Sequence, residues 1–168
     1  MTRALFIGRF QPFHNGHLNV AKSLSKKYDE IIIGIGSSQE KNTKENPFSY
    51  NERKTMISKT LKANKIKNFK IYPIPDLYDD VKWVSYILKR LPKFDAAFSG
   101  NEWTIRCFKK HKIKCRRVKL IKGINSTRIR EMMAKNEDWW ELVPLEVAEY
   151  IIKINGIKRI AGICRNRN

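Results

Sequence analysis

The sequence predicts an α/β protein with a doubly wound, five-stranded parallel sheet and a small C-terminal helical extension. Short apolar runs alternate with segments of helical periodicity five times along the chain. The runs at 4–7 and 31–35 are apolar almost throughout, as expected of strands buried on both faces of a sheet. In such sheets ligands bind beyond the carboxyl ends of the strands, where the strand order reverses. We therefore look for function in the loops that follow strands one, three and four.

The elements are predicted from local patterns in chain order. Ser49 and Glu52 form a capping-box pattern that starts the second helix. Trp83 belongs to the apolar stripe of the third helix. The expected strands are residues 4–7, 31–36, 69–75, 94–99 and an edge strand near 115–118. Together with right-handed crossovers, this alternation predicts a Rossmann-like fold.

Length and composition fit one compact domain of 168 residues. We expect a core over 1–123 and a C-terminal helical part over 124–168. The apolar fraction of 42% excludes a disordered chain. Three scattered cysteines favour a reducing cytosol over a disulfide framework or zinc site, so we expect a cytoplasmic protein. No signal peptide or membrane span is evident, and we expect no membrane partner.

The charge of the chain is strongly positive. Its formal net charge is +19 at pH 7. Such a balance favours polyanionic partners, such as nucleotides or nucleic acid. A general lysine bias of the organism would produce the same balance.

The stretch at 8–17 predicts a phosphate site. It lies between the first strand and the first helix, so Arg9, His14 and His17 gather near the helix N-terminus, whose free N–H groups favour an anion. Gly16 leaves room for a ligand to approach the backbone. No third ligand at metal spacing accompanies the histidines. The alternative is that both histidines are surface turn residues.

A second stretch, 124–130, predicts another helix start suited to anions. Asn125, Ser126 and Thr127 are all helix-capping residue types. Arg130 lies three residues after Thr127, so both can face one anion. The alternative is an ordinary N-cap with arginines in solvent.

Both stretches resemble motifs of the HxGH nucleotidylyltransferases. Residues 8–17, GRFQPFHNGH, resemble the signature of the archaeal-type nicotinamide mononucleotide (NMN) adenylyltransferases, and 124–130 resembles the second motif, I-S-S-T-x-x-R. Asn125 replaces the usual serine there, and Lys41–Thr43 replaces the Ser-His-Thr common in the family. Further similar segments occur in the family's order at 36–39, 46–48, 51–53, 83–85 and 98–101.

The resemblance implies transfer of AMP from ATP to NMN, which gives NAD and pyrophosphate. It implies that His14, His17 and Arg130 are catalytic, acting on the triphosphate by charge stabilisation rather than through a protein nucleophile. It also implies that Mg²⁺ binds through ATP phosphates and water, with no protein metal site. The ATP-binding residues carried over are Gly8, Arg9, Phe10, His14, Gly16, His17, Asn125, Ser126, Thr127 and Arg130.

For the acceptor, the resemblance implies that Trp83 stacks on the nicotinamide ring, with Asp76 and Asn101 as polar contacts. The alternatives are a core aromatic for Trp83 and loop-capping roles for the other two. The partners implied are small-molecule nucleotides and, from similar enzymes, a homo-oligomer, often a hexamer.

Two other functions stay open at this point. Another enzyme of the superfamily would share both phosphate motifs but use phosphopantetheine, FMN or a cytidylyl reaction instead. A nucleic-acid-binding protein would use the basic run at 109–117, which holds six lysines and arginines in nine positions. No recognition-helix or RNP aromatic pattern accompanies that run.

Overall fold

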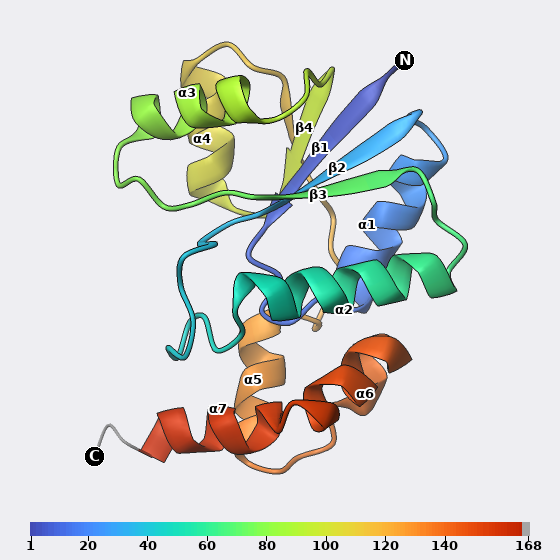
Figure 1. Cartoon of the computed structure of the whole chain (residues 1–168), viewed down its shortest axis with the longest axis vertical. Helices are drawn as coiled ribbons and strands as arrows, with labels where there is room; N and C mark the ends of the chain where they lie inside the picture. Colours follow the sequence, from blue (N-terminus) through green and yellow to red (C-terminus); the bar gives the residue numbers. More distant parts are fainter. Residues whose placement is uncertain (166–168) are drawn as a thin grey trace.

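The computed structural model describes residues 1–165 and confirms the predicted fold class. All strands run parallel in one sheet, in the order β3-β2-β1-β4-β5 (Figure 1). The order reverses between β1 and β4, so the loops that follow these two strands leave the sheet in opposite directions. The strands are β1 (Arg3–Gly8), β2 (Glu30–Ile35), β3 (Phe69–Pro73), β4 (Ala96–Ser99) and β5 (Cys115–Arg117).

Helices cover both faces of the sheet. In Figure 1, α3 and α4 lie on one face, whereas α1 and α2 lie on the other. The helices are α1 (Asn15–Ser25), α2 (Tyr50–Ala63), α3 (Asp80–Arg90), α4 (Glu102–Lys110), α5 (Ser126–Ala134), α6 (Leu145–Lys153) and α7 (Gly156–Arg165), with a short 3₁₀ helix, η1 (Trp140–Leu142).

The central strands are buried on both sides because their side chains alternate between two cores. Leu5 and Ile7 of β1 pack with α3 and α4, while Ala4 and Phe6 pack with α1 and α2. All six residues of β2 are buried. This explains why the runs at 4–7 and 31–35 lack polar alternation.

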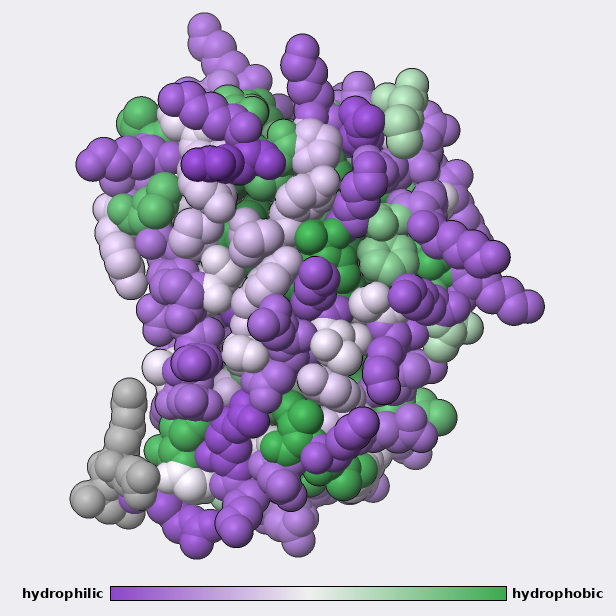
Figure 2. All heavy atoms as spheres, viewed as in Figure 1, coloured by the Kyte–Doolittle hydropathy of each residue, from purple (hydrophilic) through white to green (hydrophobic). Residues whose placement is uncertain are grey.

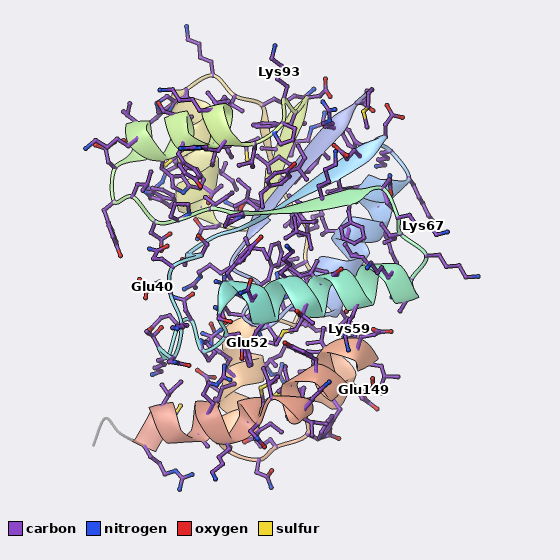
Figure 3. All side chains as sticks on the ribbon, in the orientation of Figure 1. Glu40, Glu52, Lys59, Lys67, Lys93 and Glu149 are labelled. Atoms are coloured by element: carbon purple, nitrogen blue, oxygen red, sulfur yellow. The ribbon has the colours of Figure 1, made fainter. Side chains whose placement is uncertain are left out.

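The C-terminal helices pack beneath α2. Ile129 of α5 and Ile151 of α6 belong to the same apolar core as Phe6. Glu52 and Lys59 project from α2 toward the C-terminal helices (Figure 3). Glu52 accepts two hydrogen bonds of 2.8 Å from the guanidinium of Arg159 on α7. The helical extension is thus attached to the sheet domain by a shared core and an ion pair.

Three local features differ from the sequence expectation, one being that β4 begins at Ala96, two residues later than expected. Asn155–Gly156 ends α6, as predicted, but Gly156 is also the first residue of α7. The third strand ends at Pro73, two residues early, because Pro75 lacks the N–H that a strand pairing uses. The last three residues of the predicted helical part, 166–168, lie outside the described residues.

The face of the molecule drawn in Figure 2 is largely hydrophilic. Figure 2 shows mainly hydrophilic residues on one face, with separate hydrophobic groups between them. Within residues 1–165, no helix has the length and apolar character needed to cross a bilayer.

Candidate active site

A cavity of about 470 Å³ lies at the carboxyl ends of the strands, beside the reversal of strand order. Residues that follow all five strands line it, together with the start of α5. The loops after strands one, three and four therefore line the cavity, as predicted, and so do the loops after strands two and five. The predicted site residues that line the cavity are Gly8, Arg9, Phe10, Asp76, Trp83, Asn101, His17, Ser126, Thr127 and Arg130.

Aromatic rings enclose His17 at the start of α1. The ring centroids of Phe10 and Phe13 lie 4.9 and 5.4 Å from that of His17. The backbone of Phe10 has a φ of 53°, which turns its ring over Gly8. A Cβ on Gly8 would come within 2.9 Å of that ring, so glycine is required there.

The two histidines stack on each other. Their ring centroids are 3.6 Å apart, and the His14 backbone N–H donates to His17 Nδ1 over 3.2 Å. Because Nδ1 accepts this bond, the neutral His17 ring carries its hydrogen on Nε2. His17 lines the cavity, whereas His14 is buried and does not line it. The histidine pair therefore presents one ring to the cavity.

Burial favours the neutral form of both histidines in the folded protein. Burial lowers the pKa of His14 to about 4. Burial, and then repulsion from His14, lower the pKa of His17 well below its usual value. Neutral rings avoid the cost of burying two adjacent cations.

Gly16 has a different role from the one expected. A Cβ there would lie 3.0 Å from the His14 ring and 3.4 Å from the backbone nitrogen of Ile121. Gly16 does not line the cavity. The missing side chain makes room for the His14 ring and the 121 backbone.

Helix α5 is joined directly to the loop after β1. Ser126 Oγ donates to the carbonyl oxygen of Pro12 over 3.1 Å. Asn125 is the N-cap of α5; its side chain accepts from the Arg128 N–H over 2.8 Å and does not line the cavity. Asn125, which replaces the serine usual at this position in the family, therefore still caps the helix.

Arg130 connects three segments around the cavity. Its guanidinium donates to the carbonyl oxygens of Gln11 (2.8 Å) and Lys44 (3.1 Å), and contacts Thr127 Oγ1 at 3.5 Å. Burial and repulsion from Arg9 lower its pKa. The Lys41–Thr43 segment does not line the cavity, but its neighbour Lys44 is held to α5 through this bond.

Sequence reasoning missed Arg53 on α2. Its side chain is fully buried and donates to the carbonyl oxygens of Arg9 (2.8 Å), Gly36 (2.7 Å) and Ser37 (3.0 Å). Burial, with repulsion from Arg9, lowers its pKa to about 10, so it stays charged at neutral pH. The sequence contained a signal for this residue, because Arg53 is a charged residue on the mainly apolar face of its helix.

Two guanidinium groups, of Arg9 and Arg130, therefore line the cavity, and a third, of Arg53, is bonded to the backbone of Arg9 beside it. Arg9 is exposed, while Arg53 and Arg130 are buried, and Arg9 lowers the pKa of both. Residues from the first turns of α1 and α5 line the same cavity. Like charges held together with free N–H groups favour a polyanionic ligand.

Part of the cavity lining is aromatic. Trp83 is buried and packs against Phe108, with 5.6 Å between ring centroids, so it is both a core aromatic and a cavity residue. Asp76 is half-buried and lines the cavity. Asn101 also caps α4, where its side chain accepts from the Thr104 N–H over 3.0 Å. Asn101 therefore caps the helix, as its alternative role predicted, and also lines the cavity.

No group of three or more His, Cys, Asp or Glu side chains within residues 1–165 is arranged to hold a metal ion. Asp76 is the carboxylate among the cavity-lining residues. A divalent ion at this site would therefore need most of its ligands from a bound phosphate and from water.

This chain is similar to known proteins over nearly its whole length. The cytidylyltransferase-like family matches residues 5–151. Nicotinamide-nucleotide adenylyltransferases of Thermoplasma acidophilum (43% identity; 94% of this chain, 89% of the relative) and Methanolobus tindarius (38%; 99% and 96%) match it in sequence. The chain belongs to the nicotinamide-nucleotide adenylyltransferases.

A solved structure agrees with this family in its fold. The bifunctional NMN adenylyltransferase/ADP ribose pyrophosphatase of Francisella tularensis superposes with a TM-score of 0.80 at 24% identity, covering 98% of this chain and 53% of that one. Nicotinamide-nucleotide adenylyltransferases are nucleotidyltransferases, so the chain is an enzyme of that class. The predicted family and enzyme class are thereby confirmed.

Proposed function

We propose that this chain transfers the adenylyl group of ATP to NMN, with ATP phosphates at the arginine end of the cavity and NMN at the aromatic end. The observation that carries the proposal is the meeting of two helix N-termini, α1 and α5, at one cavity. The similarity to adenylyltransferases supports the same reaction.

We assign the triphosphate of ATP to the part of the cavity that Arg9 and Arg130 line. His17 Nε2–H donates toward the phosphates, because Nδ1 is already an acceptor. Arg9, Arg130 and the free N–H groups of Ser126 and Thr127 add positive potential. The His14 ring stacks on the His17 ring and holds it in position. His14 therefore acts on the reaction through His17 rather than by contacting the phosphates.

The chemical step is a direct displacement. An oxygen of the NMN phosphate attacks the α-phosphorus of ATP, a new P–O bond forms, and the bond to the β-phosphate oxygen breaks, which releases pyrophosphate. The protein lowers the barrier by aligning the two nucleotides and by neutralising charge on the α-phosphoryl group and the leaving pyrophosphate. This displacement needs no protein nucleophile.

Magnesium fits this site as a partner of the substrate. When bound, Mg²⁺ would neutralise phosphate oxygens of ATP, with water completing its coordination. The chain's own residues supply the remaining cations. The Asp76 carboxylate is then available to interact with NMN, whose pyridinium ring carries a positive charge.

The direct test is to mix purified protein with ATP, MgCl₂ and NMN and to measure NAD and pyrophosphate. We expect both products in equal amounts. Turnover of phosphopantetheine or FMN without turnover of NMN would overturn the acceptor assignment. RNA binding at physiological salt without ATP-dependent pyrophosphate release would favour the nucleic-acid alternative. Light scattering on the same sample tests the hexamer expected from similar enzymes.

A further inference from the structure

The acceptor end of the cavity contains a second tryptophan, which the sequence motifs do not include. Trp103 is the second residue of α4, just beyond the carboxyl end of β4. It lines the cavity together with Trp83 of α3. The two indole centroids are 4.9 Å apart, and the ring planes meet at 65°.

The two rings differ in how much surface they offer. Trp83 is 3% exposed, because Phe108 and the core beneath α3 cover most of it. Trp103 is 41% exposed, although it is a large apolar side chain. The free aromatic area beside this cavity therefore belongs mainly to Trp103. An exposed tryptophan gains stabilisation when a planar ligand removes its face from water.

The charge of the acceptor ring suits this arrangement. The nicotinamide ring of NMN is a pyridinium cation, whereas the protein carries a net charge of +19. A basic protein that binds a cationic ring needs a locally favourable surface for it. Tryptophan faces attract cations through the ring quadrupole, and the Asp76 carboxylate lines the same cavity.

We propose that Trp103 forms the second aromatic wall of the acceptor site and contacts the pyridinium ring, with Trp83 forming the wall at an angle to it. This inference rests on the proposed function, because it takes NMN as the acceptor. It makes Trp103 a binding residue that sets the preference for planar, cationic acceptor rings.

The chain provides a matched control for testing this role. Trp140 is 44% exposed and stacks on the buried Trp139, with centroids 4.5 Å apart, but it does not line the cavity. Replacing either Trp103 or Trp140 with alanine removes one indole, and the two indoles are similarly exposed and each contact a buried tryptophan. General effects of losing such a pair are then common to both variants.

The experiment measures NMN and ATP binding by calorimetry and turnover by NAD formation. We expect Trp103→Ala to weaken NMN binding and raise the KM for NMN roughly tenfold, the scale of one lost stacking contact, with the KM for ATP unchanged. Trp103→Phe should recover most of the affinity, and Trp140→Ala should match wild type. The neutral, reduced form of NMN should lose less affinity in Trp103→Ala than NMN does.

The outcomes separate the two proposals. If the wild-type protein makes no NAD from ATP and NMN, the proposed function fails. If it makes NAD and Trp103→Ala binds NMN as tightly as wild type, the function stands and the role of Trp103 is wrong. Should Trp103→Ala fail to fold, Trp103→Leu keeps apolar packing on Trp83 without an aromatic face and must show the same loss of NMN affinity.

Discussion

The hydroxyl of Ser126 donates a 3.1 Å hydrogen bond to the carbonyl oxygen of Pro12, 114 residues away in the chain. This bond joins the start of α5 to the loop after β1. Arg130, one turn further along α5, reaches the neighbouring carbonyl of Gln11. The stretches at 8–17 and 124–130 are therefore one structural unit, in which α5 is bonded to the loop after β1.

Ser126→Ala should weaken this unit without removing a cation. Losing one partly buried hydrogen bond is expected to lower the free energy of unfolding by about 1 kcal/mol. The KM for ATP should rise because the loop after β1 loses a fixed partner. Urea unfolding and ATP-dependent kinetics measure both effects. Ser25→Ala removes an exposed hydroxyl bond within α1 and should change neither quantity; equal effects in the two variants would contradict the unit described here.

His17→Ala should lower kcat by about 10² or more, because the variant loses a hydrogen-bond donor aimed at developing phosphate charge. Steady-state NAD formation measures the loss, and circular dichroism checks that the fold persists. The third histidine, His111, binds the Cys107 carbonyl and does not line the cavity. His111→Ala should therefore keep wild-type turnover. Unchanged turnover in His17→Ala would remove this side chain from the catalytic site.

Stability should fall as the pH is lowered below about 6.5. The pKa values of His14 (about 4) and His17 are lowered in the folded protein, so in this range the unfolded chain takes up protons that the folded protein does not. The free energy of unfolding then decreases by up to ~1.4 kcal/mol per pH unit for each histidine. Urea unfolding between pH 7 and 5 measures the slope, above the range in which carboxylates dominate.

The variant His14→Asn tests the origin of this pH dependence. It removes one of the two titrating rings and should reduce the slope between pH 7 and 5. A slope identical to that of wild type would show that the histidine pair does not cause the acid sensitivity.

Arg53→Gln should destabilise the protein by about 3 kcal/mol or more, because several buried carbonyl oxygens lose charged donors. Arg53→Lys keeps the charge but not the forked geometry, so we expect it to recover only part of the loss. Urea unfolding measures the stability of both variants. Lys54→Gln, at the exposed neighbouring position, is the control and should be neutral. A fully stable Arg53→Lys would mean that charge alone is needed there.

The sequence alone determined the class of fold and predicted two candidate phosphate motifs at helix starts. Uninterrupted runs such as Ile31–Ile35 occur where both faces of a strand are buried, and capping residues such as Ser49 act within one turn of helix. These signals are local, so a single sequence contains them. The start of α5 just after Asn125 could be predicted for the same reason.

Only the tertiary structure decided which of those residues meet at the cavity. His17 lines it and His14 does not, because Gly16 lets one ring stack behind the other. The sequence assigned no role to Arg53 or Trp103, because the carbonyl groups that Arg53 binds and the ring that Trp103 contacts lie close to them only after folding. Contacts between distant segments follow from packing and backbone direction, which residue spacing along the chain does not specify.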